Sequence, residues 1–201
     1  MKRTLVIGSR NAHKVAEIRQ ILQDLPFAVV SVADFPDVPD VVEDGETFEA
    51  NAVKKARETA AAVQQLTLAD DSGLEVAALD GAPGVYSARY GGEPRSDARN
   101  NEKLMAELAG VPQEQRTARF RCVMALVDPM GAEVVVEGTC SGRIALEPAG
   151  QHGFGYDPLF VVDGYDQTMA QLGAAVKNRI SHRARALQEL KNVLNKMAQS
   201  S

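Results

Sequence analysis

Two neighbouring aspartates interrupt an apolar stretch in the run LADDSGLEV, Leu68 to Val76. The residues before Asp70 and after Asp71 are each typical of a short strand. Adjacent negative charges at the end of a strand repel each other and lose hydration together. We therefore expect something positive beside this pair.

Three explanations compete for the pair. An Asp commonly caps a turn, which explains one of them and not the other. A general acid and base for glycoside cleavage is disfavoured, because neighbours on an extended strand point to opposite sides and that chemistry needs both carboxyls to flank one bond. We favour the third explanation, in which one of them holds Mg²⁺ with a carboxylate from elsewhere, substrate phosphate oxygens and water. The ion removes the repulsion and lets a carboxylate orient or deprotonate a water. The neighbouring Ser72 lies in no GxSxG motif, and we expect it to donate to a phosphate or to a metal-bound water.

A second candidate is the loop that follows the first predicted strand. It consists of Gly8, Ser9, Arg10, Asn11, Ala12, His13 and Lys14. Free backbone N–H groups and the positive dipole end of the next helix make such a loop a phosphate cradle. It is not a P-loop, because no glycine precedes Lys14 and no Ser or Thr follows it. A plain helix cap by Ser9 or Asn11 is an equally good interpretation.

Three further segments carry polar or aromatic residues. Asn51 and Lys55 share one face of a predicted helix, which alone favours a solvated surface, and Glu43 precedes that helix. In the loop GQHGFGYDP, the side chains of Phe154 and Tyr156 could stack on a base with Asp157 as an acceptor, or the two aromatics could plug a hydrophobic corner. The run from Lys177 to Arg183 is predicted to open the last helix with Ser181 as its cap. His182 and Arg183 then oppose the helix dipole, so we expect an anion or a carbonyl beside them.

The elements that position these residues alternate between strands and helices. The patterns predict strands at 4–8 and 27–32, helices from 12 and over 46–63, and a glycine-rich loop over 80–92. A helix capped by Ser96 follows, then a hairpin of 117–127 and 133–144 around Asp128-Pro129-Met130-Gly131, a strand at 159–162 and a final helix with Leu187, Leu190, Leu194 and Met197 on one seam. This order predicts an α/β fold with a mixed sheet.

Composition narrows the class of protein. A chain of 201 residues with a net charge of −5 has no general attraction for nucleic acid. Two cysteines make neither a disulfide framework nor a metal site, and Cys122 fits a small core position. No apolar stretch approaches the roughly 20 residues that span a bilayer, and we expect a reduced, cytoplasmic protein without a membrane or nucleic-acid partner.

Taken together, these motifs resemble the inosine/xanthosine triphosphate pyrophosphatase family, in order from residue 4 to about 190. The matching blocks are Ser9-x-Asn11-x-x-Lys14, Glu43 before Thr47-Phe48, Asn51-Ala52-x-x-Lys55-Ala56, Asp70-Asp71-Ser72-Gly73-Leu74, Gly81 to Arg89, Phe154-Gly155-Tyr156-Asp157-Pro158 and Ser181-His182-Arg183. The chain departs from the family pattern at Ala174-Ala175-Val176, where a more acidic stretch is usual.

The resemblance implies a single domain over 1–201, with a long mixed sheet and flanking helices that form two lobes around a central cleft, and a homodimer. It implies Mg²⁺-dependent cleavage of ITP, dITP or XTP to the monophosphate and pyrophosphate. By position, Glu43 and Asp71 hold the metal and Asp71 is the base toward water. The residues implied to bind substrate are Ser9, Arg10, Asn11, Ala12, His13, Lys14, Lys55, Ser72, Phe154, Gly155, Tyr156, Asp157, Lys177, His182 and Arg183. Two other functions stay open, a non-catalytic nucleotide-binding protein and a Mg²⁺ phosphatase that releases orthophosphate.

Overall fold

A computed structural model describes residues 2–199, and the chain forms two compact units. Unit 1 contains the described residues up to Asp71, residues Cys122–Gly138 and the chain from Arg183 onward. Unit 2 contains Ser72–Arg121 and Thr139–His182. The sheet has six strands, which are β1 (Arg3–Ile7), β2 (Phe27–Ser31), β3 (Leu66–Val76), β4 (Thr117–Val127), β5 (Glu133–Ile144) and β6 (Phe160–Val162). They pair in the order β2-β1-β3-β4-β5-β6, with β1 parallel to both β2 and β3 and β5 antiparallel to β6. The predicted α/β class with a mixed sheet is confirmed.

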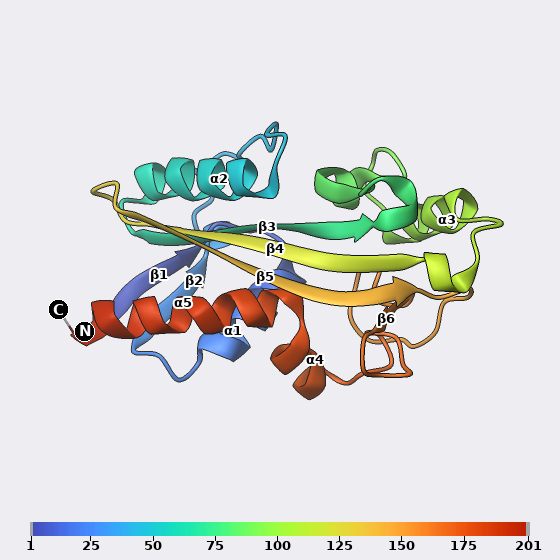
Figure 1. Cartoon of the computed structure of the whole chain (residues 1–201). Helices are drawn as coiled ribbons and strands as arrows, with labels where there is room; N and C mark the ends of the chain where they lie inside the picture. The colour runs from blue at the N-terminus through green and yellow to red at the C-terminus, as the bar shows by residue number, and fades with distance from the viewer. Residues whose placement is uncertain (1, 200–201) are drawn as a thin grey trace. The chain divides into compact units, whose positions relative to one another are not determined.

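Unit 1 is built on two short parallel strands, three helices and the first part of β3. Its elements are β1 (Arg3–Ile7), α1 (Ala12–Leu22), β2 (Phe27–Ser31), α2 (Phe48–Val63) and α5 (His182–Gln199), with the turn-side half of the β4–β5 hairpin. In Figure 1, α2 covers one face of this part of the sheet, and α1 and α5 cover the other. The apolar stripes of α1 and α5 pack on β1 and β3 through Ile18, Leu187, Leu190 and Leu194, all fully buried. The predicted seam of the last helix is therefore confirmed.

Unit 2 has its own core around the other halves of the long strands. These strands are β3 (Leu66–Val76), β4 (Thr117–Val127) and β5 (Glu133–Ile144). Unit 2 also contains α3 (Asp97–Glu107), β6 (Phe160–Val162) and α4 (Ala174–Ile180). Leu74, Leu104, Phe120 and Phe160 meet in this core. The loop predicted over 80–92 contains a 3₁₀ segment, Gly84–Arg89.

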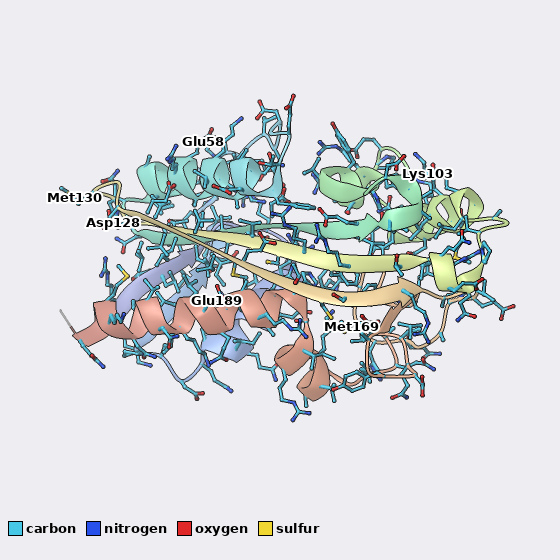
Figure 2. The ribbon with its side chains drawn as sticks, viewed as in Figure 1. Glu58, Lys103, Asp128, Met130, Met169 and Glu189 are labelled. Atoms are coloured by element: carbon cyan, nitrogen blue, oxygen red, sulfur yellow. The ribbon has the colours of Figure 1, made fainter. Side chains whose placement is uncertain are left out.

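Most helix and strand boundaries predicted from local signals in the sequence lie within two residues of those in the structure. Thr47 caps α2, so that helix begins at Phe48 instead of Glu46. Ser96 caps α3 as predicted. The hairpin has the predicted bounds, and Asp128 and Met130 mark its tip in Figure 2, where the Asp128 carboxylate accepts from two backbone N–H groups of the turn. In the described part of the chain, no helix has the length and apolarity that crossing a bilayer requires.

Two predicted boundaries were wrong. The run LADDSGLEV does not separate two strands, because it lies inside the single strand β3, which is an inner strand of the sheet. The run from Lys177 to Arg183 does not lie wholly at the start of the last helix, because Lys177 belongs to α4. Ser181 separates the two helices, and α5 begins at His182, so Ser181 has the position at the start of the last helix that is predicted for it. The first error arises because tertiary contacts override the local preference of Asp against strands, and the second because α4 is short and Gly173 makes no side-chain capping bond.

Burial of both cysteines gives a first testable prediction. Cys122 and Cys140 are fully buried, and burial, with a smaller contribution from Asp70, raises the pKa of the Cys122 thiol to about 12. Because the thiolate is the reactive form, we expect a thiol reagent such as dithionitrobenzoate to label neither cysteine of the native chain at neutral pH and both after denaturation. Labelling of a native thiol within minutes would contradict this burial.

Candidate active site

Asp70 and Asp71 point to opposite faces of β3. Asp70 is fully buried, and its Oδ2 lies 3.0 Å from Lys14 Nζ in α1 and 3.2 Å from Arg183 Nη2 in α5. Asp71 Oδ2 instead accepts a hydrogen bond of 2.9 Å from Asn51 Nδ2 of α2, the helix on the other face. The strand alternation that argued against a glycosidase pair is therefore present.

The two carboxylates have opposite electrostatic environments. Burial by itself would raise the pKa of Asp70, but the charges of Lys14 and Arg183 outweigh it and hold that pKa well below its ordinary value. Burial raises the pKa of Asp71 above its ordinary value, with a smaller contribution from the nearby charge of Glu43, although Lys55 and Lys14 oppose the shift. The positive charge expected beside the pair is supplied at Asp70 by Lys14 and Arg183 of the chain itself.

The environment of Asp71 in unit 1 suits a divalent cation. Lys55 is buried and its Nζ lies 3.1 Å from Glu43 Oε2, so α2 brings both groups near Asp71. Asn51 also accepts from Gly45 N at 2.8 Å, which ties the loop that carries Glu43 to α2. Repulsion between Glu43 and Asp71 is what a bound cation relieves.

The donor set near Asp71 also fits the requirements of Mg²⁺. Among residues 2–199 no group of three or more His, Cys, Asp or Glu side chains is placed to hold a metal. Mg²⁺ commonly takes one or two carboxylates and fills its remaining positions with phosphate oxygens and water. Glu43 and Asp71 would then be its two protein ligands.

The loop before α1 is a helix cap, and three of its backbone N–H groups donate to side chains of the loop itself. Asn11 Oδ1 accepts from His13 N at 3.0 Å and Lys14 N at 3.2 Å, and Ser9 Oγ accepts from Asn11 N at 3.2 Å. The plain capping interpretation is therefore confirmed, and it does not exclude anion binding at the same N-terminus. The Arg10 guanidinium is bound to Asp40 at 2.6 Å and to the Val38 carbonyl. Lys14 is the cation of this loop that is directed toward Asp70.

In unit 2, the segment from Phe154 to Asp157 is fixed from several sides. Asp157 Oδ2 lies 2.5 Å from Lys177 Nζ and accepts from Phe154 N at 3.0 Å, and the Lys177 ammonium is 4.7 Å from the centre of the Phe154 ring. A Cβ at Gly153 would come within 2.0 Å of Asp157 Oδ2, so the backbone can approach this carboxylate only at a glycine.

The two aromatics of that segment have different environments. Tyr156 is buried in the core of unit 2 and donates to the Ser87 carbonyl at 2.8 Å. Phe154 remains half-buried under Lys177. Of the two alternatives left open for these aromatics, Tyr156 fits the one in which it plugs a hydrophobic corner.

The cation Arg183 at the start of α5 has acidic partners, as its position against the dipole predicted. Arg183 Nη1 lies 2.7 Å from Glu17 Oε2, in addition to its contact with Asp70, and its side chain is 1% exposed. His182, in unit 2, stacks on Phe120 with ring centroids 4.8 Å apart. Sequence reasoning missed Glu17 and Phe120. A hint existed only for Glu17, which follows Lys14 by one helical turn.

The predicted substrate residues are distributed between the two units. Ser9, Arg10, Asn11, Ala12, His13, Lys14, Lys55 and Arg183 lie in unit 1 with Glu43 and Asp71, and Ser72, Phe154, Gly155, Tyr156, Asp157, Lys177 and His182 lie in unit 2. Gly155 is held by neighbours on α3, since its N–H donates to Asp97 at 2.7 Å and its carbonyl accepts from Asn101.

Comparison with known proteins agrees with this architecture. A Ham1 protein from Coxiella burnetii superimposes with a TM-score of 0.88 at 42% identity, covering 96% of this chain and 99% of that one. The Staphylococcus aureus Ham1 protein gives a TM-score of 0.86 at 43% identity, over 97% of this chain and all of the other. A model of the Ham1 family matches residues 5–193. The chain belongs to the Ham1 family.

Curated relatives carry a more specific name. The dITP/XTP pyrophosphatase of Geobacter sulfurreducens is 54% identical over 190 residues, which is 94% of this chain and 96% of that protein. The dITP/XTP pyrophosphatase of Desulforamulus reducens is 52% identical over 193 residues, 96% of each chain.

Proposed function

We propose that this chain is a Mg²⁺-dependent nucleoside triphosphate pyrophosphohydrolase that converts ITP, dITP or XTP to the monophosphate and pyrophosphate, and so removes non-standard purines from the nucleotide pool. The observation that carries the proposal is the setting of Asp71, a buried carboxylate of raised pKa beside Asn51, Lys55 and Glu43. The names of its relatives support the same reaction.

The chemistry follows from the groups in unit 1. A water hydrogen-bonded to Asp71 attacks the α-phosphorus, its proton passes to the carboxylate, and the bond from that phosphorus to the bridging oxygen breaks to release pyrophosphate. Asn51 holds Asp71 in place for this transfer. Lys14 and Lys55 offset the charge that develops on the leaving pyrophosphate, and the N-terminal end of the α1 dipole faces the phosphates in this proposal. A Mg²⁺ held by Glu43 and Asp71 would supply further charge neutralisation at the phosphates.

For the base and sugar, the proposal relies on residues that match the family pattern. Phe154 offers a ring for stacking, and Lys177, Asp157 and His182 offer polar contacts, with Ser72 next to Asp71 in the chain. Selection against adenine must rest on the 6-oxo group of hypoxanthine and xanthine, because a donor aimed at it would be left unpaired by the 6-amino group of adenine. Such a mismatch discriminates by roughly 10⁴. Guanine shares the 6-oxo group, so its rejection must rest on its 2-amino group. The chain is further proposed to act as one domain over 1–201, as a cytoplasmic homodimer without nucleic-acid or membrane partners.

The test is a product assay with ITP, XTP, dITP, ATP and GTP, each with and without Mg²⁺. We expect pyrophosphate as the first product, from the three non-standard nucleotides, and only with the metal present. Orthophosphate as the first product would indicate a phosphatase instead. If ATP and GTP were turned over as fast as the three non-standard nucleotides, the proposed substrate class would be refuted. Tight binding of nucleotide without turnover would indicate a non-catalytic nucleotide-binding protein.

A further inference from the structure

Four charged side chains of unit 1 form a chain of three ion pairs, and the proposed reaction uses only one of its members, Lys14. Asp70 of β3 contacts Lys14 at 3.0 Å and Arg183 at 3.2 Å through the same oxygen, and Arg183 contacts Glu17 at 2.7 Å. Lys14 and Glu17 are three residues apart and so share one face of α1. Two positive and two negative groups therefore tie β3, α1 and α5 together.

The network has a buried end and an accessible member that the proposed function uses. Asp70 is fully buried and Arg183 is 1% exposed at the side chain, whereas the Lys14 side chain keeps 16% of its surface exposed. Lys14 lies in the first turn of α1, where the helix dipole disfavours a cation. Its long stem has many rotamers, and an ammonium has three hydrogens to donate. A hydrogen bond to Asp70 uses one of them, fixes the stem and leaves two hydrogens for another acceptor.

We propose that Asp70 is a positioning residue for Lys14. Its carboxylate holds the ammonium of Lys14 at the N-terminus of α1, ready for a phosphate oxygen of the triphosphate. Arg183, held in turn by Glu17, fixes the Asp70 oxygen that does this. This role rests on the proposed function for its ligand class, a triphosphate, and it assigns to Asp70 a task distinct from that of Asp71.

Positioning and simple charge make opposite predictions for Asp70. As a nearby negative charge, Asp70 repels a triphosphate, so its removal alone would tighten binding. As a positioning group, Asp70 holds the Lys14 ammonium where it can bind phosphate, so removing the Asp70 charge weakens triphosphate binding. This loss should occur only in a chain that still has Lys14. The amide of Asp70→Asn keeps the shape of the side chain and removes its charge.

The experiment is a double-mutant cycle read by calorimetric titration of the full chain with inorganic tripolyphosphate in the presence of Mg²⁺. Loss of a charge-assisted hydrogen bond changes a binding constant by about tenfold or more, and we expect Lys14→Met to weaken binding about tenfold. We expect Asp70→Asn to weaken it about fivefold, and the double variant about tenfold instead of the fiftyfold of independent effects. The matched control is Glu133→Gln, which removes the carboxylate of an exposed pair with Arg57 in the same unit and should leave binding unchanged.

Several outcomes would overturn the positioning role. They are tighter binding by Asp70→Asn, multiplicative effects in the double variant, and no tripolyphosphate binding by the unmodified chain. If Asp70→Asn fails to fold, Glu17→Gln tests the same network from its partly exposed end. Glu17→Gln should weaken tripolyphosphate binding about twofold in a chain that keeps Lys14 and should have no effect in the Lys14→Met variant. An equal effect in both chains would also overturn the proposal. Failure of the unmodified chain to hydrolyse ITP, with the binding cycle as expected, would refute the proposed function alone.

Discussion

Replacement of Asp71 by Asn is expected to lower kcat for ITP by at least about 10³-fold, within the range by which a general base accelerates a reaction. The substitution removes the proton acceptor and one of the two proposed metal ligands. The fold should persist, because burial already disfavours the charged form of Asp71 and the amide can still accept from Asn51. The measurement is kcat for ITP alongside thermal unfolding.

The matched control for Asp71 is Asp44→Asn. Asp44 is an exposed carboxylate next to Glu43, and it pairs with Lys54 at 2.6 Å. An exposed pair contributes little, so the control should keep its turnover within about twofold and its melting temperature unchanged. If Asp71→Asn kept more than a tenth of the turnover of the unmodified chain, the base would have to be another residue.

Replacement of Lys177 by Met is expected to have the second large effect, on stability. The substitution leaves the Asp157 carboxylate buried without the ammonium that lies 2.5 Å away. Breaking a buried pair from one side costs about 3–5 kcal/mol in the free energy of unfolding. For a chain of this size we expect the melting temperature to fall by about 10 °C, measured by calorimetry and by urea titration.

An exposed lysine in unit 2 provides the comparison. Lys103 lies 3.7 Å from Glu107 on α3, with nearly half of its side chain exposed, and Lys103→Met should cost less than about 1 kcal/mol. The double variant Lys177→Met/Asp157→Asn should regain part of the loss, because no uncompensated charge then remains buried. Equal stability losses for Lys177→Met and Lys103→Met would show that the Asp157 pair is not buried as described.

Elements with strong local signals could be predicted from the sequence. The β4–β5 hairpin has the predicted bounds because its turn residues and the alternation on both sides agree. Helix α4 was missed because it is seven residues long and its N-cap, Gly173, makes no side-chain capping bond. Strand β3 was divided in two because Asp is rare in strands, and only partners far along the chain make its position there tolerable.

The same distinction applies to the candidate site. The residue types around Asp71 could be named from spacing, since Asn51 and Lys55 are one turn apart on α2. The partner of Asp70 could not, because Arg183 is 113 residues away in the chain, and Glu17 is 166 residues from Arg183. The misfit of a cation at the start of α5 correctly predicted that Arg183 has an anionic partner. It could not show that carboxylates of the chain itself fill that place.

The alternation of Asp70 and Asp71 across β3 also limits how this segment can vary in length. Inserting or deleting one residue just before them would rotate both side chains to the other face. The acid balanced by Arg183 would then lie beneath α2, and the acid of raised pKa would lie among fixed cations. Single-residue indels at this point should therefore be more damaging than most substitutions, even where every amino acid type is retained.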